Sequence, residues 1–268
     1  MAGPLVGRCV VVTRAPSQAG PLVDALRRRG ARPLAYPCID IAPPRDCGPL
    51  DRLLMAAARG DADWLVLTSA NAAASLRRRL DALGLAPRRL AGLAVATVGP
   101  STAGAAEREL GLGPHATPSV YVADALPDLL GPLSGARVLL PQADVAGPEL
   151  ASSLAAAGAQ VSAVVAYRTV PGRGGPRLLG RLRRRQIDAV TLASPSSARH
   201  LVARLHEEGG GVEDLDDALL ACIGPRTRAE VVRLGLAPAV VAPRSTCSAL
   251  VAELEHAFAD PRPSQETR

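Results

Sequence analysis

The chain has 268 residues, enough for two domains of ordinary size, and its formal net charge of +6 suits anionic partners. All 31 basic side chains are arginine because the sequence contains no lysine, which excludes lysine Schiff-base chemistry and the lysine of a phosphate-binding loop. Aromatic residues make up only 2% of the chain, which argues against a base-stacking surface for single-stranded nucleic acid.

Strand-length apolar runs alternate with helix-length segments along nearly the whole chain. In chain order we expect strands near residues 9–13, 31–36, 64–68, 93–98, 136–140, 160–166, 188–193, 219–223 and 239–242, with helices in most of the gaps. Helices at 18–29 and 149–157 each carry an apolar stripe that ends before a glycine. This alternation is typical of βα units around a parallel sheet and predicts an α/β protein.

Two proline-containing segments, 36–44 and 167–171, interrupt this pattern. Proline fixes the backbone and cannot donate a ladder hydrogen bond, so each segment is predicted to be an extended crossing segment outside a sheet interior. Short arginine runs at 27–29, 77–79 and 183–185 fall at expected helix ends, where cations interact favourably with the helix dipole. Because the runs are short and separate, this interpretation is favoured over nucleic-acid binding.

Five cysteines occur without C-x-x-C spacing, which argues against a disulfide framework and a zinc site and favours a reducing cytoplasm. The first residues lack the apolar core of a signal peptide, and no apolar run is long enough to span a bilayer. We therefore expect a cytoplasmic protein with no membrane segment, no metal and no nucleic-acid partner.

The chain repeats itself at an offset of 125 residues. Residues 63–69 align with residues 188–194, and residues 98–102 align with residues 223–227. Such a repeat predicts two similar modules that share a cleft. The modules could be tandem, divided near residue 134, or one could be inserted in the other, and periodicity does not choose between these arrangements.

Polar turns follow the expected strands in both copies of the repeat. Thr68, Ser69 and Asn71 lie between a strand and a helix, and Ser194 and Ser196 do so in the second copy. Hydroxyl and amide side chains at this junction cap free helical N–H groups, and the same N–H groups bind carboxylates or phosphates. A cap is the more common role of any single such residue, but the duplication strengthens the hypothesis of a binding site.

A Gly-Pro-x-Thr motif makes the same transition further along each copy. The two motifs end in Thr102 and Thr227, each 33 residues after the matching serine of the polar turn. Glycine allows close approach of the backbone, and proline suits the first helical position. The equal spacing adds these threonines to the candidate binding residues. No nucleophile, metalloprotease or dinucleotide motif accompanies them.

The order and spacing of these motifs resemble the uroporphyrinogen-III synthase family over nearly the whole chain. The matching segments are 12–14, 18–19, 64–72, 98–103, 165–171 and 223–227. The resemblance implies an α/β fold with two similar domains, each holding a parallel, five-stranded, doubly wound (flavodoxin-like) sheet. One domain would combine 1–37 with 172–268, the other would be an inserted 38–171, and segments 37–43 and 167–171 would form a two-stranded connector.

The function implied by this resemblance is cyclisation of the linear tetrapyrrole hydroxymethylbilane to uroporphyrinogen III, with inversion of the last ring through azafulvene and spiro intermediates. This activity is that of a cyclising hydro-lyase without metal or organic cofactor. The family resemblance also implies a monomer, and we expect a transient contact with the preceding pathway enzyme. The alternative hypothesis is a noncatalytic tetrapyrrole or anion sensor with the same fold.

The site residues implied by the resemblance match the turns described above. Tyr167 would help the hydroxide leave, or alternatively it would only pack against the sheet. The expected substrate-binding residues are Arg14, Thr68, Ser69, Asn71, Thr102, Ser194, Ser196 and Thr227. Three departures from the family pattern weaken individual assignments: residues 141–144 replace an Arg-Gly pair, Ala193 replaces a hydroxyl residue, and Arg228 replaces a small one.

Overall fold

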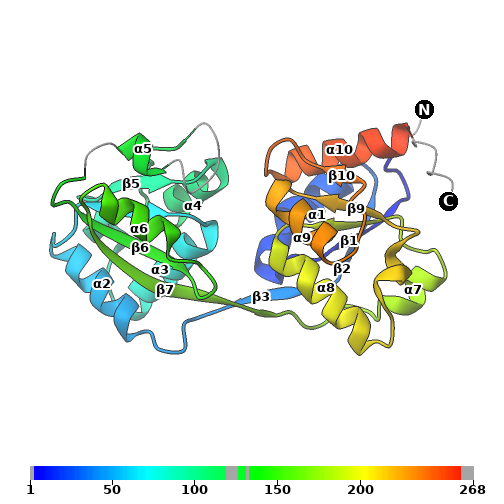
Figure 1. Ribbon diagram of the computed structural model, residues 1–268, viewed down its shortest axis with the longest axis horizontal. Coiled ribbons are helices and arrows are strands. Elements are labelled where there is room, and N and C mark those ends of the chain that lie inside the picture. The colour runs from blue at the N-terminus through cyan, green and yellow to red at the C-terminus, as the bar shows by residue number, and fades with distance from the viewer. Residues whose placement is uncertain (1–2, 119–125, 131–132, 261–268) are drawn as a thin grey trace. The chain divides into compact units, whose positions relative to one another are not determined.

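A computed structural model describes residues 3–118, 126–130 and 133–260 of the chain. The chain forms two compact units, each built on a five-stranded sheet (Figure 1). Unit 1 contains Met1–Asp40 and Val170–Arg268, and unit 2 contains Ile41–Thr169. In the described part of the chain, no helix has both the length and the apolar character needed to cross a membrane.

Unit 1 draws its strands from both ends of the chain. The order in its sheet is β10-β9-β8-β1-β2, and all four pairings are parallel. The strands are β1 (Cys9–Val12), β2 (Arg32–Ala35), β8 (Ala189–Leu192), β9 (Leu219–Cys222) and β10 (Val240–Val241). The helices are α1 (Pro16–Arg28), α7 (Leu179–Arg183), α8 (Pro195–Glu207), the 3-10 helix η3 (Val212–Leu215), α9 (Pro225–Arg233) and α10 (Cys247–Ala259).

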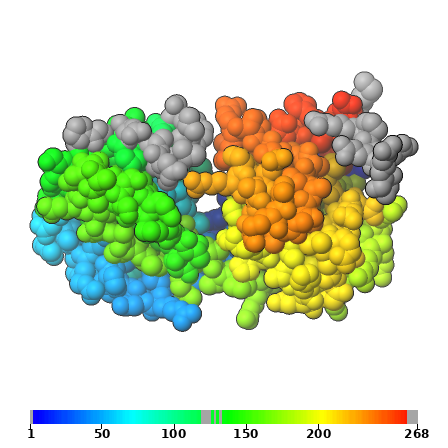
Figure 2. Space-filling view, in the orientation of Figure 1, coloured from blue at the N-terminus to red at the C-terminus, as the bar shows by residue number. Residues whose placement is uncertain are grey.

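Helices cover both faces of the unit 1 sheet, because successive residues of β1 point to opposite sides. Val10 packs in one core with leucines of α1 and α10, whereas Val11 packs in a second core with α8 and α9. All four residues of β1 are buried. On the face shown in Figure 2, yellow and orange segments hide almost all of the blue N-terminal strands.

Unit 2 is built on the same plan from the middle of the chain. The order in its sheet is β3-β7-β6-β4-β5, and the pairings among β7, β6, β4 and β5 are parallel. The strands are β3 (Ile39–Ala42), β4 (Trp64–Leu67), β5 (Ala94–Thr97), β6 (Arg137–Ala143) and β7 (Gln160–Pro171). The helices are α2 (Gly48–Ala58), α3 (Ala70–Ala82), the 3-10 helix η1 (Pro87–Leu90), α4 (Pro100–Leu110), α5 (Leu126–Leu130) and α6 (Glu149–Ala156).

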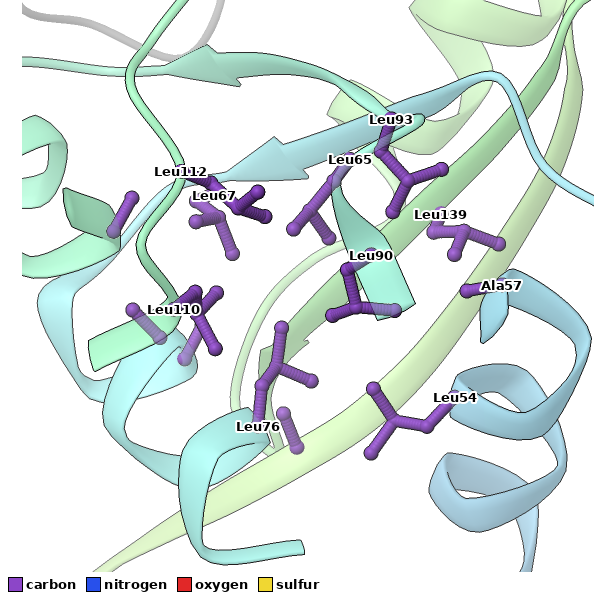
Figure 3. Packing of buried hydrophobic residues seen from close by; sticks show 14 of the residues in the cluster. Leu54, Ala57, Leu65, Leu67, Leu76, Leu90, Leu93, Leu110, Leu112 and Leu139 are labelled. Carbon is purple, nitrogen blue, oxygen red and sulfur yellow. The ribbon is translucent and has the colours of Figure 1, made fainter. Parts of the chain in front are cut away.

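The larger core of unit 2 consists mainly of leucine and alanine. Leu65 and Leu67 of β4 lie among leucines of α2, α3, η1 and α4 (Figure 3). The opposite face of β4 presents Val66 to a smaller core that includes α5 and α6. Burial of one such leucine contributes roughly 1.5–3 kcal/mol, so these apolar faces position the strand ends that carry the polar turns.

The repeat in the sequence is also a repeat in the structure. Asp63, just before β4, accepts hydrogen bonds from the backbone N and the guanidinium of Arg137, at the start of β6. Its counterpart Asp188, just before β8, accepts from the backbone N of Cys9 at the start of β1 and from the guanidinium of Arg8. The strand series β2-β1-β8-β9 of unit 1 therefore corresponds to β7-β6-β4-β5 of unit 2.

The connecting segments are extended, as expected. Residues 39–42 form β3 within the segment expected as one connector strand, although the apolar pattern had not indicated it, and 167–171 continue the expected strand at 160–166 as a single β7 of 12 residues. An edge position explains why prolines on both sides of β3 are tolerated, because an edge strand pairs along only one side. Within residues 3–118, 126–130 and 133–260, the sheet of unit 1 has no such strand and carries β10 at its other edge, where unit 2 has a bridge from Ala96 to Ala116.

Candidate functional site

The polar turns in each unit lie at one edge of its sheet, because the carboxyl ends of parallel strands meet there. The chain leaves β1 towards β2 on one side and leaves β8 towards β9 on the other, so the strand order reverses between β1 and β8. In unit 2 the corresponding reversal lies between β6 and β4. Ligands of open α/β sheets bind in the crevice outside the strand ends at such a point.

In unit 2, Ser69 and Asn71 are positioned by the start of α3. Ser69 is the N-cap residue, and its Oγ accepts a hydrogen bond of 3.1 Å from the backbone N of Asn71. Thr68 is half-buried between β4 and this cap. The cap predicted as the common role of such a serine is therefore present, and it fixes where the side chains of Ser69 and Asn71 point.

Tyr167 lies against this turn. The residue is 7% exposed, and the side chains of Ser69 and Asn71 lie close enough to the phenol to influence its ionisation. Burial raises the pKa of Tyr167 above its ordinary value, and the polar side chains of Ser69 and Asn71 oppose this effect. A phenol with a raised pKa is protonated at neutral pH, so Tyr167 can donate a proton or a hydrogen bond to a bound molecule.

A β-bulge directs Tyr167 into this position. Gln142 of β6 pairs with Val165, but the next residue, Ala143, pairs with Tyr167, so Ala166 is the extra residue of β7. As a result Ala166 and Tyr167 are consecutive and yet both buried in the same core, which regular alternation along a strand would forbid. Bulges near functional sites commonly change the direction of a side chain in this way.

Two residues that sequence reasoning did not identify hold the bulge. The Oγ of Ser75, buried in α3, donates a hydrogen bond to the carbonyl of Ala166. Asp144 donates from its backbone N to the carbonyl of Tyr167 at 3.0 Å, and its Oδ1 accepts from the backbone N of Thr169 at 3.2 Å. Asp144 lies in the segment that departs from the family pattern. Its two hydrogen bonds link β7 to the residue that follows β6.

The two Gly-Pro-x-Thr turns form a matched pair. Gly99 and Gly224 are the N-cap residues of α4 and α9, and neither offers a side chain to cap the first N–H groups. Thr102 and Thr227 are 7% and 3% exposed, so both lie mostly inside the first helical turn. Among the described residues, neither hydroxyl has a hydrogen-bond partner. These turns thus keep backbone donors and a hydroxyl available for a ligand.

The second serine turn lies beside β1 at the reversal point of unit 1. Ser194 is the N-cap residue of α8 in a capping box with Ser197, whose backbone N lies 3.1 Å from the Oγ of Ser194. Ser196 accepts a hydrogen bond of 3.2 Å from the exposed Arg199. Both predicted serines therefore have structural partners within their own helix.

Arg14 follows β1 and reaches the start of α10. Its Nη1 lies 3.1 Å from the Sγ of Cys247, the first residue of that helix. Thr246 caps α10 by accepting from the backbone N of Ala249 at 3.2 Å, a role that its place between a strand and an apolar helix could have indicated. No group of three His, Cys, Asp or Glu side chains in the described ranges is arranged to hold a metal ion.

Comparisons with known proteins agree over most of the chain. The family model of uroporphyrinogen-III synthase HemD matches residues 20–252. The uroporphyrinogen-III synthase of Synechococcus elongatus is 30% identical over 229 residues, which cover 84% of this chain and 85% of that protein. The porphyrin biosynthesis protein HemD of Ruminiclostridium josui is 28% identical over 261 residues, and the match spans 95% of this chain but 49% of that longer protein.

A solved structure resembles the chain in fold. A mutant uroporphyrinogen III synthase from the thermophilic bacterium Thermus thermophilus superposes with a TM-score of 0.64 at 22% identity, covering 94% of this chain and 99% of that one. At this level of identity the likeness is evidence of the α/β architecture alone.

Proposed function

The chain belongs to the uroporphyrinogen-III synthase family and cyclises hydroxymethylbilane, and we propose that it does so with the polar turns at the carboxyl edges of its two sheets. The family model and the relative from Synechococcus elongatus both cover most of the chain. The alternative of a noncatalytic sensor is not favoured, since both comparisons name the enzyme.

The substrate is a flexible linear tetrapyrrole with eight carboxylates, so the protein must supply many separate anion sites. In unit 2 these are Thr68, Ser69, Asn71 and the turn that ends in Thr102. In unit 1 they are Arg14, Ser194, Ser196 and the turn that ends in Thr227. Support comes from the helix N-termini at all these turns, whose N–H groups and positive dipole ends favour carboxylates. An arginine adds bidentate hydrogen bonding.

The reaction begins with loss of the terminal hydroxyl group, and Tyr167 is the residue assigned to this step. Its phenol donates a hydrogen bond to the hydroxyl oxygen as the carbon–oxygen bond breaks. The hydroxide and the pyrrole N–H proton are lost together as water, which gives a neutral azafulvene. The substituted carbon of the last ring then attacks to form a spiro intermediate, and recombination inverts that ring. Positioning of the reacting carbons supplies most of the remaining barrier reduction.

The observation that carries this assignment is the buried phenol beside the polar side chains of Ser69 and Asn71 at the carboxyl edge of unit 2. A phenol that only packed against the sheet would not need two polar side chains at its oxygen. The raised pKa keeps the proton in place for donation at neutral pH.

Replacement of Tyr167 by Phe tests the assignment. We expect kcat for uroporphyrinogen III to fall by about 100-fold, the ordinary contribution of a general acid, with the fold retained. Uroporphyrinogen isomers formed from hydroxymethylbilane are resolved by chromatography, because uncatalysed closure gives the type I isomer. Tyr36→Phe is the matched control, since Tyr36 is a fully buried tyrosine in the other unit that bonds Glu208.

Two outcomes would count against these proposals. An unchanged rate for Tyr167→Phe would remove this residue from the mechanism, whereas a wild-type protein that gives only the type I isomer at the uncatalysed rate would contradict the activity itself. A loss of activity in Tyr36→Phe equal to that in Tyr167→Phe would show that the assay reports stability instead of chemistry.

The proposal extends to the architecture. We regard each sheet as doubly wound and flavodoxin-like, with 38–171 as a domain inserted in one made of 1–37 and 172–268, and with 37–43 and 167–171 as a two-stranded connector. The strand order of unit 1 supports this view, since it corresponds to 2-1-3-4-5 when its strands are numbered along the chain. Neighbouring positions of β3 and β7 in one sheet support the connector.

We further propose that the protein is a cytoplasmic monomer and that it contacts the preceding pathway enzyme only transiently. The five cysteines are free, which suits a reducing compartment. Light scattering of the purified protein tests the oligomeric state against the chain mass of 27.5 kDa.

A further inference from the structure

A cavity of about 580 Å³ opens at the amino ends of the unit 1 strands, the edge opposite to the polar turns. Residues around it include Cys9 at the start of β1, Arg32 at the start of β2, and Arg181, Arg185 and Asp188 between α7 and β8. Its volume is in the range of small-molecule sites. Because parallel strands have their amino ends at one edge, this cavity is separate from the proposed substrate site.

The positive charge around the cavity is only partly balanced by carboxylates of the protein. Asp188 is its only lining carboxylate, and both oxygens are occupied, by the guanidinium of Arg8 at 2.7 Å and by the backbone N of Cys9 at 2.7 Å. The Nε of Arg32 donates only to the neutral carbonyl of Gly7. In the described part of the chain, neither Arg32 nor Arg181 forms an ion pair.

Two of the arginines, Arg32 and Arg181, line the same cavity as the buried thiol of Cys9. Burial raises the pKa of Cys9, while the charges of Arg32 and Arg181 act in the opposite direction. Both guanidinium groups are therefore close enough to Cys9 to affect its ionisation. Arg185 pairs with Asp217, but both side chains are mostly exposed, so solvent screens this pair and leaves Arg185 able to exchange partners.

The internal repeat provides a comparison within the same molecule. Arg181 and Arg185 correspond to Ala56 and Gly60, because the hydrogen bond from Gln186 N to Arg181 O matches the one from Asp61 N to Ala56 O. Arg32 pairs with Cys9 as Gln160 pairs with Arg137, so Arg32 corresponds to Gln160. Unit 2 thus builds the same strands and helix end with no arginine at any of the three positions.

Arg185 occupies its position at a conformational cost. Its φ is +53°, in the left-handed region, and it is the only non-glycine residue of the described chain with a positive φ. The corresponding Gly60 has a φ of +85°, the usual choice for such a helix end. Retention of a cationic side chain where glycine fits better indicates a role for that charge other than folding.

We propose that this cavity is a second ligand site of unit 1, which binds a small molecule carrying two or more phosphate or carboxylate groups through Arg32, Arg181 and Arg185. Guanidinium groups bind both kinds of group with paired, charge-assisted hydrogen bonds, so the shared chemistry is that of a compact polyanion.

The test replaces the three cavity arginines by the residues that unit 2 has at the corresponding positions. The triple variant Arg32→Gln, Arg181→Ala, Arg185→Gly is compared with a control triple, Arg28→Gln, Arg78→Gln, Arg88→Gln, which removes equal charge from exposed positions. Binding of pyrophosphate and of citrate is measured by isothermal titration calorimetry at constant ionic strength, with chloride as the reference anion. The two probes distinguish a preference for phosphate from one for carboxylate.

We expect saturable one-to-one binding of at least one probe by the wild type and by the control triple, and binding weaker by about tenfold or more in the cavity variant. The KM for hydroxymethylbilane should stay unchanged in the cavity variant. The proposal is overturned by absence of saturable binding to the wild type, by equal binding in the two triple variants, or by a KM for hydroxymethylbilane that rises tenfold in the cavity variant alone. The last result would assign the cavity to the substrate.

Discussion

At the scale of single residues, the position of Tyr167 depends on neighbours that have no role in substrate binding. Sequence resemblance identified the tyrosine, but it did not identify Ser75, which is 2% exposed within α3 and bonds the carbonyl of the bulged Ala166. A serine in the middle of a helix gives no sequence signal, because its partner is 91 residues away. Its contribution follows only from the register shift between β6 and β7.

Replacement of Ser75 by Ala should therefore disturb Tyr167 without touching the substrate. The carbonyl of Ala166 loses its hydrogen bond, which costs about 1–3 kcal/mol if no water replaces the hydroxyl. We expect kcat to fall with little change in KM, since the phenol moves while the carboxylate sites stay in place. Ser75→Thr retains the hydroxyl and should restore kcat in part. A rise in KM at unchanged kcat would show that Ser75 does not act through Tyr167.

At the scale of elements, the strands were the most predictable part of the chain. The expected strands all reappear with ends shifted by a few residues, because buried parallel strands are short apolar runs in the sequence as well. The apolar pattern did not indicate β3, because prolines on both sides suppress the signal of a strand, and only the connector implied by the family resemblance pointed to it. The polar turns could be predicted because they directly follow those strands, whereas Asp144 acts through a bulge that periodicity does not reveal.

The serine turns leave one question that an element-scale experiment can answer, namely whether Ser194 only caps α8 or also binds substrate. Removal of the cap in Ser194→Ala should lower the free energy of unfolding by about 1 kcal/mol. Ser194→Asp retains an acceptor for the backbone N of Ser197 and adds a negative charge that suits a helix N-terminus. Its stability in urea should therefore match that of the wild type.

The two variants separate the roles because their charges differ. A carboxylate at position 194 repels the carboxylates of the substrate, so KM should rise more in Ser194→Asp than in Ser194→Ala if this turn binds substrate. Equal KM values in the wild type and in Ser194→Asp would limit Ser194 to capping. Ser134→Asp is a suitable control for the added charge, since Ser134 is exposed and precedes β6, at the edge of the unit 2 sheet opposite to the polar turns.

At the scale of the whole molecule, the two units differ in how the chain builds them: unit 2 comes from one continuous segment, and unit 1 combines two segments that are far apart in the sequence. All strands of unit 2 lie within residues 39–171, and both of its cores are formed by residues of that range. Unit 1 instead takes β1 and β2 from the first 40 residues and its remaining strands from the last third of the chain. In this sheet β1 lies between the central strand β8 and the edge strand β2, with no exposed residue.

This difference predicts unequal behaviour of two fragments. Residues 38–171 should fold alone, with a cooperative thermal transition by circular dichroism, because the fragment retains the complete sheet and both cores of unit 2. Residues 172–268 should not, because β8 would lose Val10, Val11 and Val12 as partners and α10 would lose the leucines of α1. Addition of residues 1–37 as a separate peptide should restore a cooperative transition in that fragment. A cooperative transition of 172–268 without the peptide would mean that the sheet of unit 1 does not require β1 and β2, which would contradict this prediction.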